Sequence, residues 1–112
     1  MKRIEKPWGE EQWVVHNEHY ALKIIKVKAG HRTSLQYHNV KHETNYIDSG
    51  SVKATVESNN GELEVRVFGP GSVIDVSPGR KHRIEALEDT RMIEVSTPQL
   101  DDLVRVEDDY RR

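Results

Sequence analysis

The sequence of 112 residues contains no cysteine. Disulfide bonds, thiolate metal sites and cysteine nucleophiles are therefore excluded, so a bound metal ion would need nitrogen or oxygen ligands. The absence of cysteine also fits a reducing compartment, and we expect the protein to be cytoplasmic.

Long apolar runs and an excess of basic residues are missing as well. No segment approaches the roughly 20 apolar residues that a membrane-spanning helix needs, and no apolar signal region follows the amino terminus. The 17 lysine and arginine residues are outnumbered by 19 aspartate and glutamate residues, which gives a net charge of −2. Because nucleic-acid binding needs a clustered basic excess, we expect neither a nucleic acid nor a membrane as partner.

The residues that are present follow a two-residue period almost throughout. Residues 52–57 and 63–67 alternate apolar and polar side chains, and the Asn59-Asn60-Gly61 sequence between them is typical of a β-hairpin turn. No window shows a helical apolar stripe of sufficient length. The other segments predicted as strands are residues 12–16, 20–28, 34–38, 43–48, 72–76, 82–87, 91–96 and 103–106.

Glycine and proline punctuate these predicted strands at residues 29–30, 49–50, 69–71 and 77–79. Many short strands at regular spacing, separated by such turns, predict an all-β antiparallel sandwich or barrel. The length suits one domain over residues 1–112. A double-sheet jelly roll is the architecture that fits this pattern best.

Two separate segments supply a ligand set for a divalent metal ion. Gln36 and His38 lie two residues apart in a predicted strand, so their side chains point to the same face. With Glu43 and His82 they offer one amide oxygen, two imidazoles and one carboxylate, which suits Zn²⁺, Mn²⁺ or Fe²⁺. The alternative is two half-buried histidines and a surface carboxylate. Four ligand-type residues at inward-facing strand positions favour the metal site.

The same segments resemble the two sequence motifs of the cupin superfamily. The first motif is matched by Gly30, Gln36-Tyr37-His38, Glu43 and Gly50, with Gln36 where many cupins have histidine. The second motif is matched by Gly71, Ser77-Pro78-Gly79 and His82, with Ser77 and Ala86 replacing the usual proline and asparagine. The resemblance implies a cupin double-stranded β-helix, which is a jelly-roll barrel.

Further segments are similar to the type II mannose-6-phosphate isomerase cupin, which is usually the C-terminal part of a bifunctional mannose-1-phosphate guanylyltransferase/isomerase. They are Pro7-Trp8-Gly9 and residues 30–38, 81–85 and 104–110. The resemblance implies one divalent metal ion, zinc first and manganese, iron, cobalt or nickel as alternatives. It also implies interconversion of mannose 6-phosphate and fructose 6-phosphate or a related sugar phosphate. Because no Gly-rich nucleotide-binding loop opens the sequence, we do not expect nucleotidyl transfer.

Two basic residues are the candidate catalytic groups. Lys41 precedes Glu43 by two residues, so we expect both side chains in one cavity. A neighbouring metal cation would disfavour the ammonium form of Lys41, which suits proton transfer or substrate orientation, unless the side chain reaches out to solvent. Arg32 lies in the stretch shared with the family and could bind phosphate or stabilise an enediolate, unless it pairs with a surface carboxylate.

Other positions bear on the substrate. Asn45 faces the cavity by alternation and replaces a tryptophan typical of the family, which gives a smaller and more polar wall. Arg80, in a turn, is a further phosphate candidate. Asn39 and Val40 stand where the family typically has histidines, and alternation predicts that His42 is exposed. The resemblance therefore supports the predicted metal ligands more directly than it supports the predicted substrate.

The remaining charged and aromatic residues have structural interpretations. Lys81 and Arg83 alternate with His82 and are predicted to form a solvated face. Trp8 and Trp13 are interpreted as packing anchors, and residues 107–109 as a solvated acidic tail.

Three functions compete at this point. The first is the metal-dependent sugar-phosphate isomerase, and the alternative is a cupin that binds a sugar or sugar phosphate without converting it. An Fe²⁺-dependent oxygenase ranks third. Such cupins generally use more histidine ligands, whereas Gln36 occupies one of the ligand positions here. Lone cupin domains often pair edge strands or exchange an N-terminal strand, so we expect a homodimer.

Overall fold

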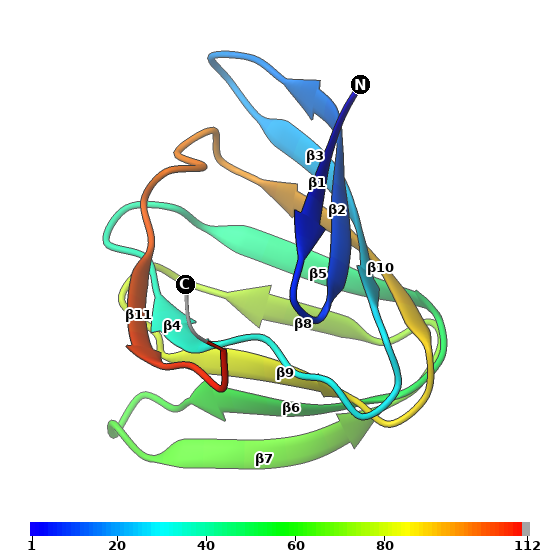
Figure 1. The fold of residues 1–112 in the computed structure, drawn as a ribbon. Helices are drawn as coiled ribbons and strands as arrows, with labels where there is room; N and C mark the ends of the chain where they lie inside the picture. The colour runs from blue at the N-terminus through cyan, green and yellow to red at the C-terminus, as the bar shows by residue number, and fades with distance from the viewer. Residues whose placement is uncertain (111–112) are drawn as a thin grey trace.

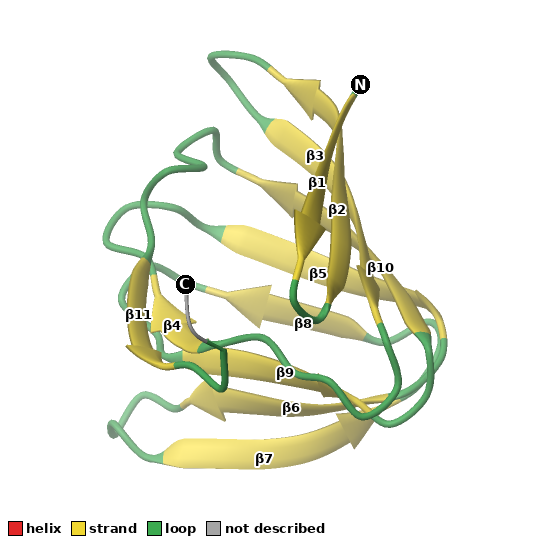
Figure 2. Cartoon of the chain, in the orientation of Figure 1, coloured by secondary structure: helices red, strands yellow, loops and turns green. Residues whose placement is uncertain are grey.

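The computed structural model describes residues 1–110 of the chain as an all-β structure (Figures 1 and 2). In chain order the strands are β1 (Lys2–Lys6), β2 (Gly9–His16), β3 (Ala21–Val27), β4 (Leu35–Tyr37), β5 (Glu43–Ser49), β6 (Val52–Glu57), β7 (Leu63–Phe68), β8 (Val73–Val76), β9 (His82–Ala86), β10 (Thr90–Ser96) and β11 (Val104–Glu107). None of residues 1–110 forms a helix that could span a membrane. The all-β prediction is confirmed.

The strands form two antiparallel sheets that face each other (Figure 1). One sheet has the order β1-β2-β3-β10-β5-β8, and the other has the order β11-β4-β9-β6-β7. Strands that follow each other in the chain often lie in different sheets, as β3 and β4 do, which is expected when a chain winds between two sheets. This arrangement matches the predicted double-sheet jelly roll.

The β6–β7 hairpin illustrates how local sequence produces the fold. Its six residue pairs are in regular register, and the turn contains Gly61 at φ +83°, a left-handed conformation that glycine adopts without steric cost. On β6, Val52 and Ala54 are buried while Lys53 between them is exposed. Alternation therefore buries one face of the strand against the other sheet.

Neighbouring inward-facing rows of side chains differ in chemistry. One row across β3, β10 and β5 consists of Lys23, Glu94 and Asn45. The adjacent row on the same strands consists of Ile25, Met92 and Ile47. The apolar core thus fills one end of the space between the sheets and leaves the other end lined by buried polar groups. Its members include Trp8, Ile25, Val27, Ile47, Val52, Ile74, Val76, Ile84 and Met92.

The first strand, β1, was not among the predicted strands. Four of its five residues are charged, and Ile4 is its single apolar residue, so no alternation marks it. It forms because β2 offers a paired edge, and the register runs without interruption from Lys2 opposite Trp13 to Lys6 opposite Gly9. Tertiary pairing overrides weak strand propensity here.

The predicted solvated face is wrong for Arg83, whereas Glu107 and Asp109 of the predicted solvated acidic tail are exposed. Arg83 is buried, and its guanidinium donates hydrogen bonds to the backbone oxygens of Thr33 (3.0 Å) and Glu107 (3.3 Å). Residues 107–109 are not a free tail, because Asp109 accepts two hydrogen bonds from Arg32. Glu107 at the end of β11 and Asp109 just after it are thus partners of these two cations. Trp8, by contrast, is a buried core residue as predicted.

Candidate metal centre

Three predicted ligands, His38, Glu43 and His82, converge at the polar end of the space between the sheets. His38 follows β4, whereas Glu43 and His82 are the first residues of β5 and β9. One possible ligand atom from each residue lies within 4.8 Å of the others, and all three side chains are buried. The Nε2 atoms of His38 and His82 are 2.8 and 3.7 Å from Glu43 Oε1.

The two imidazoles have the tautomer that a metal ion requires. The Nδ1 atom of His38 lies 2.5 Å from the backbone oxygen of Asp102, and that of His82 lies 2.9 Å from the backbone oxygen of Arg80. Since a carbonyl oxygen can only accept, both Nδ1 atoms carry the hydrogen, and in the neutral rings both Nε2 atoms therefore present lone pairs. Burial lowers the pKa of His82, which favours its neutral form.

These Nε2 atoms are buried and have no hydrogen-bond partner among the described residues. Two lone pairs therefore face the Glu43 carboxylate with no donor between them, an arrangement that a cation would resolve. Burial would raise the pKa of Glu43, but contacts with its neighbours, among them the Lys41 ammonium and the Asn45 amide, hold that pKa well below its usual value. The residues present fit a divalent metal ion.

Gln36 borders the same cavity but is held differently from the triad. Its backbone lies opposite His82 in the β4–β9 register, and it lines the cavity with the three ligands. Its Oε1 accepts a 2.7 Å hydrogen bond from the Ser34 hydroxyl. An amide oxygen has a second lone pair, so this bond orients Gln36 without excluding the predicted fourth ligand.

Asn45 and Lys41 support the Glu43 carboxylate. Asn45 Nδ2 donates to Glu43 Oε2 at 2.8 Å, which confirms that Asn45 faces the cavity. Lys41 Nζ lies 3.4 Å from Glu43 Oε1 and 3.1 Å from Glu94 Oε2, and the lysine is buried rather than extended to solvent. Burial alone would lower the pKa of Lys41, but Glu94 and Glu43 together raise it. In the absence of a metal cation, the Lys41 side chain is therefore a protonated ammonium group that donates hydrogen bonds.

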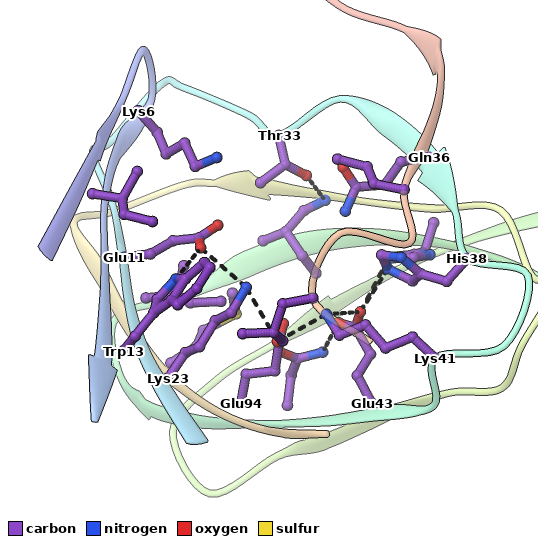
Figure 3. A pocket seen from close by; sticks show the side chains of 18 of the residues that line it. Lys6, Glu11, Trp13, Lys23, Thr33, Gln36, His38, Lys41, Glu43 and Glu94 are labelled. Atoms are coloured by element: carbon purple, nitrogen blue, oxygen red, sulfur yellow. Dashed lines mark hydrogen bonds and ion pairs between the residues drawn. The ribbon is translucent and has the colours of Figure 1, made fainter. Parts of the chain in front are cut away.

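The Lys41 pair continues into a chain of buried charges that sequence reasoning missed (Figure 3). Glu94 also lies 4.0 Å from Lys23, whose Nζ donates to Glu11 at 3.1 Å, and Trp13 Nε1 donates to the same Glu11 oxygen at 3.0 Å. Burial and the nearby Glu43 carboxylate raise the pKa of Glu94 to about 7. The sequence signal for this chain of charges is that Lys23 and Glu94 share the inward phase of β3 and β10 with Ile25 and Met92.

A cavity of about 530 Å³ connects the triad to the N-terminal hairpin. Its far wall is formed by β1, which contributes Lys2 and Lys6, and by Trp13 of β2 (Figure 3). The Nζ atoms of Lys2 and Lys23 lie 4.8 and 5.0 Å from the Trp13 ring centroid, within cation–π distance. Trp13 is therefore a wall of the cavity in addition to a packing residue.

Asp102 fixes the loop between the ligands His38 and Glu43, and it was not identified from the sequence. Its carboxylate accepts hydrogen bonds from the backbone N–H groups of Asn39 (3.0 Å), Val40 (2.7 Å) and Lys41 (3.0 Å). These bonds lower the pKa of Asp102 to about 2. Because its backbone oxygen also accepts from His38, one residue orients both the loop and a ligand.

The structure does not bring Arg32 and Arg80 into the cavity. Arg32 forms a bidentate pair with Asp109, at 2.5 and 2.7 Å, which is the surface ion pair considered as its alternative. Arg80 donates to the Asn59 side chain and to the Glu57 backbone oxygen, on the outside of the β6–β7 hairpin. Both guanidinium groups bind partners that are close in the structure but distant in the sequence, so the sequence spacing does not indicate them.

Two facing antiparallel sheets with a buried His–Glu–His cluster define the cupin class, and solved structures agree. KdgF from Halomonas sp. superposes with a TM-score of 0.79 at 20% identity, covering 90% of this chain and 91% of that chain. Oxalate decarboxylase OxdC from Bacillus subtilis gives a TM-score of 0.84 at 20% identity, covering 94% of this chain and 30% of that chain. The predicted cupin fold is confirmed.

The family within this class follows from the sequence itself. Residues 1–108 match the family described as mannose-6-phosphate isomerase C-terminal, and the chain belongs to this family. Mannose-1-phosphate guanylyltransferase ManC of Salmonella typhimurium (strain LT2) is 32% identical over 116 residues, and the Escherichia coli K12 enzyme of that name is 28% identical over 116 residues. Each alignment covers 99% of this chain but 23% of the relative's length.

Proposed function

We propose that the protein is a metal-dependent aldose–ketose isomerase that interconverts mannose 6-phosphate and fructose 6-phosphate or a related sugar phosphate. The observation that carries this proposal is the pair of buried, unpartnered Nε2 atoms beside Glu43, at one end of a polar cavity. Membership of the mannose-6-phosphate isomerase C-terminal family supports the choice of reaction.

His38, Glu43 and His82 would hold the metal ion, with Gln36 as the fourth ligand. When bound, a divalent ion with one anionic ligand supplies Lewis-acid polarisation of a sugar carbonyl or hydroxyl. Zinc is our first choice from the ligand types. Manganese is the alternative, because Mn(II) centres are described in Bacillus subtilis oxalate decarboxylase, a cupin fold at 21% identity.

The neighbouring residues can provide the proton chemistry. Isomerisation moves one proton from C2 to C1 of the aldose and another between the two oxygens, so a base and a donor are needed. Lys41, an ammonium held by two carboxylates, can donate to a substrate oxygen and orient it. Glu94 is the neighbouring carboxyl group that is not a metal ligand. We assign it the role of the base that carries the proton from C2 to C1.

The phosphate group would lie at the far end of the cavity. Arg32 and Arg80 are outside it, whereas Lys2 and Lys6 line it, and Lys6 lies across from His38 (Figure 3). Lysine ammonium groups bind phosphate as point charges. Replacing both lysines by alanine is expected to raise KM for the phosphorylated sugar more than for the free sugar, in steady-state assays. Equal effects on both substrates would place the phosphate elsewhere.

The reaction can be tested by following the substrate C2 hydrogen. Metal-loaded protein in D₂O should convert mannose 6-phosphate and introduce deuterium into the product, as read by mass spectrometry. Glu43→Ala should abolish both metal content and turnover. His42→Ala is the matched control, because His42 is exposed and pairs with Asp75 outside the cavity. Metal-loaded protein that converts no aldose phosphate would refute the isomerase proposal.

A non-catalytic sugar-phosphate-binding cupin is the second candidate. It is favoured by the mutual neutralisation of Lys41 and Glu94, which lie 3.1 Å apart in a buried pair. Such a pair serves binding as readily as catalysis. Calorimetric binding of mannose 6-phosphate by the metal-loaded protein, without product or deuterium exchange, would establish this function in place of the first.

A further inference from the structure

The β7 strand is an exposed sheet edge with an unusual amount of apolar surface. It is the last strand of its sheet, and its side chains at positions 63–67 are all exposed. Leu63, Val65 and Val67 retain 47%, 52% and 67% of their accessible surface. An uncovered strand of this kind is a template for pairing with another strand.

The other three sheet edges formed by residues 1–110 each carry a protective feature. β1 has four charged residues out of five, and β8 is only four residues long. The pairing of β11 shifts register between Arg105 and Glu107. Charge, short length and irregularity are the usual means of preventing edge association. β7 is less protected, since only two of its six residues are charged, with opposite signs, and its pairing with β6 is regular over six residues.

The backbone groups of alternate β7 residues point to this open edge. Ser58 N–H donates to the Glu62 oxygen across the hairpin at 2.8 Å, and in an antiparallel pair the hydrogen-bonded residues alternate with those that are not. Glu64 and Arg66 therefore bond toward β6. Leu63, Val65 and Val67 direct their N–H and C=O groups away from it, where a second strand can reach them.

The geometry points to a second copy of this chain as the partner, with β7 pairing antiparallel to β7 about a two-fold axis at Val65. In this register Val65 faces Val65 of the second copy, and Leu63 faces Val67. These positions are the hydrogen-bonded pairs, with two backbone bonds each. The two five-stranded sheets become one continuous sheet, distant from the cavity.

Charge selects this register over its neighbours. Pairing about Val65 places Glu64 opposite Arg66 of the second copy, in the closer, non-hydrogen-bonded positions. Moving the axis to Glu64 or to Arg66 would place like charges opposite each other, which is unfavourable. Within one chain these two side chains already attract each other, at 3.7 Å and largely exposed, so both are available for exchange. The strand is thus self-complementary in backbone, apolar contacts and charge.

Charge exchange between two variants tests this pairing. Wild-type protein should have twice the 13.0 kDa chain mass by light scattering at micromolar to 100 micromolar concentration. Glu64→Arg and Arg66→Glu each place like charges opposite each other, so each variant alone should be monomeric. Mixed in equal amounts they should restore the dimer, and native mass spectrometry should identify it as the heterodimer.

A backbone variant and a surface control complete the experiment. Val65→Pro removes an N–H group that β6 does not use, so it should give a monomer with unchanged far-ultraviolet circular dichroism. Val73→Lys, at an exposed apolar position on the β8 edge, should remain dimeric. A monomeric wild type, a dimer that survives all β7 variants, or a mixture that does not reassociate would each overturn the proposal. None of these results depends on isomerase activity.

Discussion

Replacing Glu94 with glutamine is the most informative single perturbation of the buried charge chain. Glu94 is 5% exposed and lies between Lys41 at 3.1 Å and Lys23 at 4.0 Å. Glutamine keeps the shape of the side chain but cannot ionise. Each lysine retains one carboxylate partner, Glu43 or Glu11, so we expect the variant to fold.

The expected effect on stability is a change in its pH dependence. Burial and the Glu43 carboxylate raise the pKa of Glu94 from 4.5 to about 7 in the folded state. A carboxyl whose folded pKa is raised binds its proton more tightly when folded. Its contribution therefore favours folding below the unfolded pKa of 4.5 and is lost as the pH rises through 7. A shift of this size corresponds to about 3 kcal/mol between these limits.

Urea unfolding at pH 5, 6, 7 and 8, with a chelator present, measures this contribution of Glu94 to the free energy of unfolding. The stability of the wild type relative to Glu94→Gln should fall by about 2.5 kcal/mol from pH 5 to pH 8, because the unfolded carboxyl is already partly ionised at pH 5. Taking the difference between the two proteins cancels the titration of groups that both retain. A difference that does not vary with pH would show that Glu94 is ionised throughout, and the reasoning about its burial would be refuted.

Three further predictions concern the metal, the surface arginine and the core. Zinc at one hundred times its Kd should stabilise chelator-treated protein by about 2.7 kcal/mol in thermal unfolding, whereas His82→Ala should not respond. Arg32→Ala should leave kcat/KM unchanged, because its partner is Asp109 outside the cavity; a loss of tenfold or more would restore its predicted catalytic role. Ile47→Ala, at a fully buried position, should cost about 2–5 kcal/mol in urea unfolding while metal binding persists.

The fold was predictable because alternation of side chains records burial directly. In β6, Val52 and Ala54 are buried and Lys53 between them is exposed, and the sequence shows the same alternation of apolar and polar residues. β1 escaped prediction since its charged residues face solvent or the cavity, and only pairing with β2 makes it a strand. A single sequence does not reveal such pairing.

The triad was predictable for a different reason, namely the ligand types of His38, Glu43 and His82 and their match to the two cupin motifs. The rest of the site depends on contacts between distant segments. Lys23 lies twelve residues from Glu11, Lys41 lies 53 residues from Glu94, and Arg32 lies 77 residues from Asp109. The sequence alone does not show which opposite charges meet inside a cavity, because their partners come from other strands.

Asp102 makes the metal centre depend on a part of the chain that contains none of its ligands. Its carboxylate holds the loop from Asn39 to Lys41, and its carbonyl sets which nitrogen of His38 is free. A chain shortened before residue 100 would keep every candidate ligand, yet it would lose the acceptor that fixes the His38 ring. The metal ligands and the residue that orients one of them thus lie in different segments of the chain. A homologous sequence should be inspected for both.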